Sequence, residues 1–365
     1  MKLRLISAAA ALGAVILLAP AGSAQEFPYQ IFERYLEPLA QQIGMPGLSA
    51  VIARNGIVEW ERGYGHADLE AKIAATPDTP YPIGGVTQAM TGVLLGICVD
   101  RLQLRVDEPI RDYVPTFPVA GATVRQVLAH ASELRYKYDP VQFVALTAVV
   151  EKCSRRPYRV AVADELLTRL TMTSSAPGLD LARSEGQAAR LLFEPGPLAR
   201  YDAVLGRVAV PYRIDRKGNS VRLEYPTYGL DAAGGLVASA RDLARFERDL
   251  DQGVPLSFST LNQMWGAATF GSDGLPAIPG STGAVTMPTG LGWFVQSLQA
   301  GTDKRLVWSF GHIPDAGSAL ILKMPHKRLT LILLSNSDGL AAGYGLERGD
   351  INASPFVKIF LRLFL

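Results

Sequence analysis

The segment from Tyr81 to Gly92 constrains the fold of this chain more than any other. It contains Pro82 and a glycine pair, Gly84 and Gly85, and then continues as apolar residues at helical spacing. The sequence therefore predicts a loop that leads directly into a buried helix. The first turn of a helix has free N–H groups and the positive end of the helix dipole, which together favour a carbonyl oxygen or an oxyanion.

The N-terminal residues have the pattern of a secretory signal peptide. Lys2 and Arg4 are followed by an apolar run from Leu5 to Leu18, and small residues at 22–24 suit cleavage. The run is short for a membrane span, and Pro20 ends it. We predict a signal peptide over residues 1–24, cleaved near Ala24, and a secreted or periplasmic protein without a stable membrane span. A leader that is retained as an anchor is the less favoured alternative.

Charge and cysteine content limit the possible partners and the compartment. The chain has 36 basic and 34 acidic residues, and removal of Lys2 and Arg4 leaves 34 of each. A net charge near zero argues against nucleic acid and against anionic membrane surfaces as partners. Cys98 and Cys153 both fall in predicted helices. They either form a disulfide in an oxidising compartment or remain two small buried side chains, and the sequence leaves both open.

Periodicity places strands at both ends of the chain and helices in the middle. Predicted helices include 29–43, 91–102, 139–155, 243–250 and 356–365; predicted strands include 48–54, 57–64, 290–296, 305–310, 318–324 and 329–334. We therefore predict an α/β (α+β) fold in which both chain ends build one antiparallel sheet, flanked by helices and carrying a large helical insert. The predicted division is residues 25–80 and 286–365 for the sheet domain and 81–285 for the insert, with a cleft between them.

Five stretches, taken in order, resemble the serine β-lactamase and penicillin-binding-protein superfamily, in its class C β-lactamase, esterase and D-aminopeptidase-like branch. They are Tyr81–Gly92 with Leu102–Ile110, Thr123–Ser132, Tyr138–Pro140 with Phe143 and Glu151, Ala233–Val237 with Asp242 and Phe246, and Gly290–Trp293 with Phe310–His312. The resemblance extends over residues 29–334 and implies a β-lactamase/transpeptidase-like fold.

The resemblance implies an S-x-x-K motif at the helix start, in which the serine attacks a carbonyl and the lysine activates it. The spacing places both side chains on one helix face. In this chain the two positions are Gly85 and Gln88. Glycine has no side chain to acylate, and a neutral amide is not a base. Thr87 is the only hydroxyl within the motif, and two residues along a helix it points away from that face.

Two further family motifs are also incomplete. Where the family has Y-x-N, this chain keeps Tyr138 but has Pro140 in place of the asparagine. Where the family has K-T-G or H-x-G, it keeps His312 but has Pro314 in place of the glycine. The combined loss of the serine, lysine, asparagine and glycine predicts a protein that no longer performs acyl transfer.

The predicted site therefore consists of remnant positions. Gly85, Gln88, Tyr138 and His312 are the catalytic remnants, and Gly85, Tyr138, His312 and Asp315 are the predicted substrate-binding residues. We expect the residual cleft to bind a peptide, a peptidoglycan fragment or a partner protein. One alternative is an ester or amide hydrolase that activates water with Tyr138 and His312, and another is a purely structural or interaction protein.

The sequence predicts neither a metal nor a cofactor. His66, His130 and His326 are scattered and lack metal-ligand spacing. The glycines form no phosphate-binding pattern.

Overall fold

A computed structural model describes residues 23–226, 229–299 and 302–365. The predicted signal peptide, apart from Ser23 and Ala24, lies outside the described residues. The first described element is α1 (Ser23–Ile43). Within these described ranges, no helix has both the length and the apolar character needed to cross a membrane.

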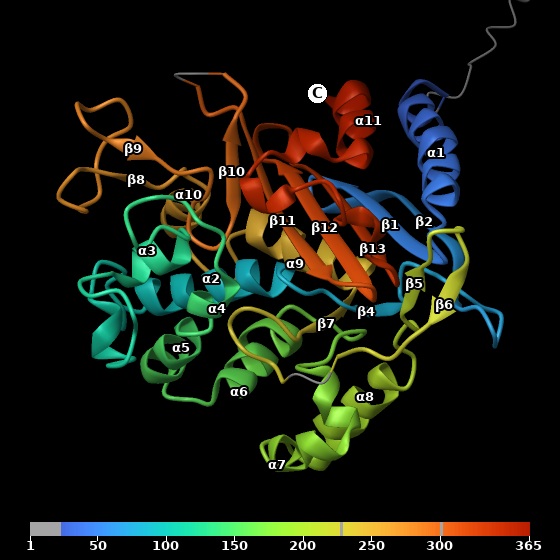
Figure 1. Cartoon of the computed structure of the whole chain (residues 1–365), viewed down its shortest axis with the longest axis horizontal. Helices are drawn as coiled ribbons and strands as arrows, with labels where there is room; N and C mark the ends of the chain where they lie inside the picture. The colour runs from blue at the N-terminus through green and yellow to red at the C-terminus, as the bar shows by residue number, and fades with distance from the viewer. Residues whose placement is uncertain (1–22, 227–228, 300–301) are drawn as a thin grey trace, which may run out of the picture.

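The centre of the molecule is an antiparallel sheet with the strand order β10-β11-β12-β13-β1-β2-β3 (Figure 1). Its strands are β1 (Gly47–Arg54), β2 (Ile57–Asp68), β3 (Ile73–Ala74), β10 (Phe294–Ser297), β11 (Arg305–Ile313), β12 (Gly317–Met324) and β13 (Leu329–Ser335). β1 pairs with β13 from Leu48↔Ser335 to Arg54↔Leu329. The two ends of the chain therefore build one sheet, which confirms the predicted fold class.

Helices cover both faces of this sheet. Successive residues of a strand point to opposite faces, so neighbours on β13 join different cores. Leu331 and Leu333 pack in the cluster that includes α1 and α11 (Pro355–Phe364), whereas Ile332 and Leu334 pack in the cluster that includes α2 (Val86–Asp100) and α9 (Ala240–Asp251). β12 and β13 are buried along their whole length because both faces are covered. α1 and α11 lie side by side on one face (Figure 1).

Local signals in the sequence explain several boundaries. Asn55 and Gly56 both have positive φ, at 52° and 76°, as a tight turn between β1 and β2 requires. The Thr123 side chain and Gln126 form a capping box at the start of α3 (Val124–Leu128). Ser239 and Ser354 cap α9 and α11 through their side-chain oxygens.

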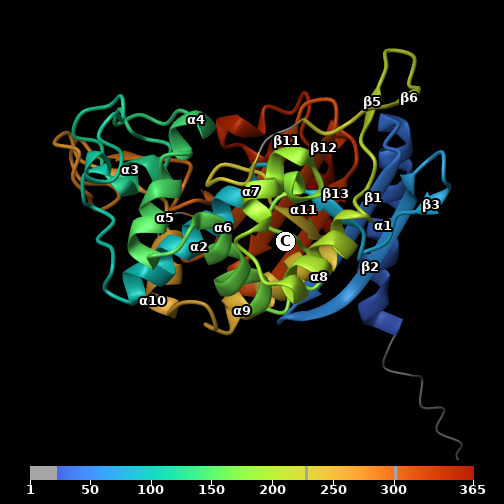
Figure 2. The same ribbon diagram turned by 90° about the horizontal axis from the view of Figure 1, so that it is seen from below.

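The middle of the chain forms a helical layer that lies to the left of the sheet and below it in Figure 1, and Figure 2 shows this layer from below. Its helices are η1 (Ile110–Asp112), α3, α4 (Pro140–Phe143), α5 (Leu146–Ser154), α6 (Tyr158–Val162), the π-helical η2 (Ala163–Thr168), η3 (Leu179–Ala182), η4 (Ser184–Gly186), α7 (Gln187–Arg190), α8 (Pro195–Leu205) and α10 (Phe258–Met264). Short ladders join β4 (Pro80–Pro82) to β7 (Val237–Ser239), β5 (Tyr212–Ile214) to β6 (Ser220–Arg222) and β8 (Thr269–Phe270) to β9 (Val285–Thr286). Single helical turns near the C-terminus are η5 (Pro325–Lys327), η6 (Asp338–Leu340), η7 (Leu346–Arg348) and η8 (Ile351–Ala353).

One predicted helix, residues 139–155, is divided. The structure has α4 and α5 instead, separated by two residues. At this joint Ala145 N–H donates to Gln142 O and Thr147 N–H donates to Val144 O, which is the tighter i→i−3 pattern. Periodicity does not distinguish this pattern from a continuous α-helix, so the sequence did not reveal the division.

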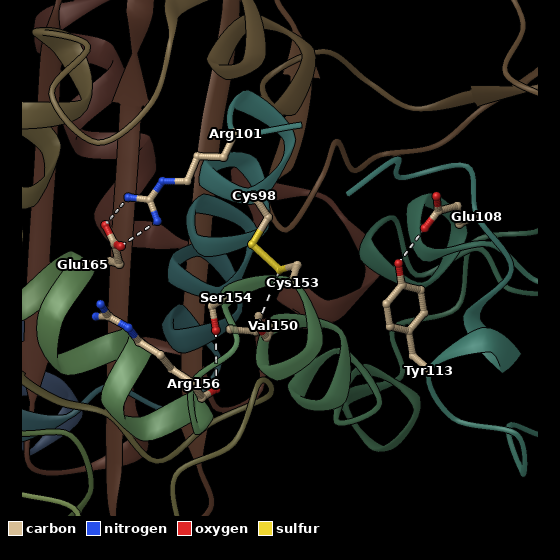
Figure 3. The surroundings of a disulfide bond; sticks show 9 residues. All are labelled: Cys98, Arg101, Glu108, Tyr113, Val150, Cys153, Ser154, Arg156 and Glu165. Carbon is tan, nitrogen blue, oxygen red and sulfur yellow. Dashed lines mark hydrogen bonds and ion pairs between the residues drawn. A yellow bond between two sulfur atoms is a disulfide. The ribbon is translucent and has the colours of Figure 1, made fainter. Parts of the chain in front are cut away.

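A disulfide joins the helical layer internally, which resolves the alternatives that the sequence left open. Cys98 at the end of α2 bonds to Cys153 on α5, with Cα atoms 6.0 Å apart (Figure 3). The bond closes a loop between residues 55 positions apart. By the chain-entropy model this is worth about 4 kcal/mol of stability. Close by, Arg101 forms a two-pronged ion pair with Glu165 at 2.7 and 2.9 Å.

Candidate ligand-binding cleft

The loop before α2 is held tightly between two other segments. Ile83 N–H donates to Leu236 O at 3.0 Å, next to the β4–β7 ladder. On the other side β11 passes so closely that a Cβ on Gly311 would lie 2.0 Å from Ile83 O. Glycine is required at 311 because no side chain fits there. These contacts fix Gly84 and Gly85 against β11.

The helix start differs in one respect from the prediction of several free N–H groups. Val86, Thr87 and Gln88 donate their N–H groups to the carbonyls of Ile83, Gly84 and Gly85 at 3.0–3.1 Å. These three donors are therefore occupied. The N–H of Gly85 itself has no hydrogen-bond partner among residues 23–226, 229–299 and 302–365.

A cleft of about 520 Å³ opens in front of this helix start. It contains Gly85, Gln88, Tyr138 and His312, so the structure brings the four remnant catalytic positions to one wall. Its other lining residues are Gly84, Pro140, Val141, Val144, Pro226, Asp231, Ala233, Gly234, Phe310, Ile313, Pro314 and Glu347. Most of this wall is apolar. Asp315 is not part of it, and Thr87 is fully buried behind it.

A hydrogen-bonded chain occupies the place where the family has its lysine. The N–H of Asp139 donates to His130 Nδ1 at 3.2 Å, so the ring proton of a neutral His130 is on Nε2. Nε2–H then donates to Gln88 Oε1 at 3.1 Å. The Gln88 amide nitrogen donates in turn to the Tyr138 hydroxyl at 3.1 Å. Each of these three N–H donors therefore meets an acceptor.

Burial keeps this network uncharged at neutral pH. It lowers the pKa of His130 to about 4, against a small opposing effect of Asp139. Burial also raises the pKa of Tyr138 to about 12, although the hydrogen bond from Gln88 acts in the opposite direction. Beside position 85 the wall therefore offers the amide of Gln88 and the phenol of Tyr138, and the neutral imidazole of His130 lies buried behind Gln88. None of these is a charged base beside position 85.

The space in which a nucleophile would lie is filled. A Cβ added to Gly85 would be 2.7 Å from the backbone oxygen of Phe310 and 2.9 Å from the Tyr138 hydroxyl. Both distances are shorter than protein Cβ contacts allow, and the carbonyl belongs to strand β11, which is paired to β12. The φ of Gly85 is −63°, so the backbone angle is ordinary and the obstruction is steric.

The acid that faces His312 is Asp338 rather than the neighbouring Asp315. His312 Nε2 lies 3.8 Å from Asp338 Oδ2, and this contact is the main cause of a lowered pKa for Asp338. Asp315 is in the turn after β11 with φ of 60°, and its N–H donates to Asp338 Oδ2 at 3.1 Å. Pro314 has no N–H. The N–H of residue 315 is therefore occupied, and residue 314 has none to offer a ligand at this end of the strand.

Sequence reasoning missed several residues of the cleft. His130 lies within the family-like stretch Thr123–Ser132, which was a usable signal, but its hydrogen bond to Gln88 spans 42 positions. Phe310, Asp231, Glu347 and Asp338 reach the region from distant segments. Phe310 begins the family-like stretch Phe310–His312, but nothing in the local sequence marks the other three. Among the described residues, no group of three or more histidine, cysteine or acidic side chains is arranged to hold a metal.

A larger hollow of about 710 Å³ lies elsewhere, between α1, β2 and α9. It is lined by four arginines, and each is paired with an acid: Arg62 with Glu33, Arg241 with Glu61 and Asp78, Arg245 with Asp242, and Arg248 with Asp249. The charges of this hollow satisfy one another. We therefore assign it to the attachment of α1 and α9 to the sheet.

The fold and the cleft indicate the class of protein, and comparison with known proteins identifies the same class. The family model described as Beta-lactamase matches residues 32–351. This chain belongs to that serine hydrolase-fold family. It is similar in fold to a penicillin-binding protein homologue from Pyrococcus abyssi (TM-score 0.68, 21% identity, covering 88% of this chain and 76% of that one). It is likewise similar to a class C β-lactamase from Rhodobacter sphaeroides (TM-score 0.65, 15% identity, covering 92% and 99%).

Curated relatives match over shorter stretches. Protein flp of Staphylococcus aureus is 29% identical over 145 residues, which is 38% of this chain and 28% of that protein. The mitochondrial serine β-lactamase-like protein LACTB of Homo sapiens is 28% identical over 108 residues, covering 28% and 20%. A D-aminopeptidase of Brucella canis is 29% identical over 157 residues, covering 42% and 28%. The matches span less than a third of the length of these relatives.

Proposed function

We propose that this protein is a secreted or periplasmic pseudoenzyme of the β-lactamase family that binds a ligand in its cleft without forming an acyl-enzyme. The observation that carries the proposal is the closure of position 85. The Phe310 carbonyl and the Tyr138 hydroxyl occupy the volume that a nucleophilic side chain would need. The chain has thus not merely lost a serine, because its neighbours have packed into the space. A peptide, a peptidoglycan fragment or a partner protein is the proposed ligand.

The surroundings of Gln88 support the same proposal. His130 presents an N–H to this position, because its other ring nitrogen is used by Asp139. A lysine at 88 would place an ammonium donor against this N–H donor. An amide avoids the conflict because it has both an acceptor and a donor. The network therefore favours glutamine and disfavours the catalytic base.

Two features support the proposed location. The leader pattern over residues 1–24 suits export, and the Cys98–Cys153 disulfide suits an oxidising compartment.

We propose that residues 25–80 and 286–365 act as one domain and 81–285 as the other. On this division α2 and β11 belong to different domains, and both contribute residues to the cleft.

Covalent probes test the proposal. The mature protein is incubated with a fluorescent penicillin, a fluorophosphonate and short-chain nitrophenyl esters, beside a serine β-lactamase as a positive control. We expect no covalent label and no turnover above the uncatalysed rate. Covalent labelling overturns the proposal. Turnover that disappears in Tyr138→Phe but persists in Tyr136→Phe, a neighbouring tyrosine bonded to a backbone carbonyl, does the same.

One observation favours a second candidate function. His312 and Asp338 form a pair at 3.8 Å beside the cleft, and such a pair can activate a water molecule for ester or amide hydrolysis. In that case the nitrophenyl esters are turned over without labelling, and His312→Ala abolishes the turnover. If neither turnover nor ligand binding is found, a structural or interaction role is favoured.

A further inference from the structure

The wall of the cleft carries acidic side chains without basic ones to balance them. Asp231 and Glu347 both line it, and no lysine or arginine does so within the described part of the chain. His312 also lines the cleft, and the Asp338 carboxylate already faces its Nε2. The electrostatic potential in the cleft is therefore negative or neutral. A ligand that carries a carboxylate finds no cation there.

Asp231 is the more enclosed of the two acids. Its Oδ1 accepts hydrogen bonds from the N–H groups of Ala233 and Gly234 at 2.8 and 3.1 Å, which orients the carboxylate. In the described residues Oδ2 has no hydrogen-bond partner. Partial burial raises the pKa of Asp231, although the hydrogen bonds from the N–H groups of Ala233 and Gly234 act in the opposite direction. A bound cation would supply the interaction that the protein itself does not provide.

The rest of the cleft is suited to an apolar group. Val141 on α4 is 81% exposed and Val144 is 40% exposed, although both belong to the wall. Ile313, Pro314 and Pro226 add further apolar surface. Covering such surface is favourable at about 25 cal/mol per Å². A ligand with an apolar body would therefore gain contacts in this cleft.

We propose that the cleft selects ligands that combine an apolar body with a protonated amine, and that it discriminates against ligands carrying a carboxylate. This inference rests on the proposed binding function and specifies its ligand class. It implies that penicillins, which carry a carboxylate, bind poorly even without any chemistry. It also implies that a peptide enters with an amine, rather than its C-terminal carboxylate, beside Asp231 and Glu347.

Three probes that differ in one terminal group test the inference. Phenylbutylamine, phenylbutanol and phenylbutyrate are titrated into the mature protein at low ionic strength, and dissociation constants are measured by calorimetry or by NMR shifts. We expect the amine to bind tightest and the carboxylate weakest. An interaction of about 1 kcal/mol with each acid corresponds to about fivefold in affinity. The preference for the amine should decrease as salt is added.

Charge-neutral variants identify which acids cause the preference for the amine. Asp231→Asn keeps the acceptor for Ala233 and Gly234, and Glu347→Gln keeps the backbone carbonyl that accepts from Tyr136. We expect each variant to weaken binding of phenylbutylamine about fivefold and to leave phenylbutanol unchanged. Glu194→Gln is the matched control, because Glu194 is exposed at the start of α8 and is not part of the cleft wall.

The outcomes separate this inference from the proposed function. Phenylbutyrate binding as tightly as phenylbutylamine overturns the inference, and so do variants that behave like Glu194→Gln. Absence of binding by all three probes overturns it as well and removes support for a binding role. Covalent labelling by penicillin or fluorophosphonate overturns the pseudoenzyme proposal separately, whether or not the amine preference is observed.

Discussion

Replacing Gly85 by serine and Gln88 by lysine would recreate the S-x-x-K spacing at the start of α2. The structure predicts that this pair of changes destabilises the protein without restoring catalysis. The new Cβ would lie 2.7 Å from the Phe310 carbonyl, which is held in the sheet. Overpacking of this kind costs about 1–3 kcal/mol. The lysine would add a conflict with the N–H of His130. We therefore expect the double variant to lose more stability than the Gly85→Ser variant alone.

Catalysis should stay near the uncatalysed rate for a related reason. A serine forced into this space displaces Tyr138 or β11, and either movement alters the wall that would have to position a substrate. The nucleophile and its base account for about a million-fold in rate in serine hydrolases, so even a small restoration would be detectable with nitrophenyl esters. Pro140 and Pro314 also remain in place of the other two motif residues.

The measurement pairs thermal or chemical unfolding with the covalent and turnover assays. Gly196→Ser is the matched control. Gly196 lies near the start of α8, and apart from its chain neighbours and the backbone of its own helix, no atom of the described residues lies within 4 Å of its added Cβ. We expect this control to be neutral or slightly stabilising. Wild-type stability in Gly85→Ser, or robust labelling of the double variant by fluorescent penicillin, would refute the reasoning.

Three further predictions follow from the network and the disulfide. Gln88→Glu should raise the pKa of His130 well above 4, because a carboxylate would accept its N–H; an unchanged NMR titration contradicts the network. Because the pKa of His130 is depressed in the folded protein, the unfolded chain binds more protons between pH 6.5 and 4. The free energy of unfolding should therefore decrease by up to about 3 kcal/mol as the pH falls from 6.5 to 4. In pH-dependent unfolding, His130→Gln should make the free energy of unfolding less dependent on pH over this range. Cys98→Ser with Cys153→Ser should lower the free energy of unfolding by about 4 kcal/mol, and reduction of the native protein should match it.

Much of the fold could be predicted because its signals are local. The apolar run after Gly85, the Asn55-Gly56 turn and the caps at Thr123 and Ser354 each depend on residues within a few positions of one another. Strand patterns at both chain ends indicated a shared sheet, and the pairing of β1 with β13 confirms it. The order of five short motifs indicated the family, which the match over residues 32–351 confirms.

The details of the cleft depend on contacts between distant segments. The sequence shows that position 85 is a glycine. Whether a side chain would fit there depends on where β11 and Tyr138 lie in the folded protein. The sequence placed Asp315 beside His312, whereas folding brings Asp338 there from η6. Whether Cys98 reaches Cys153 was equally undetermined until α2 and α5 were packed together. Short-range patterns specify helices, turns and strands through backbone geometry, but which side chains meet across a cleft is set by the packing of whole layers.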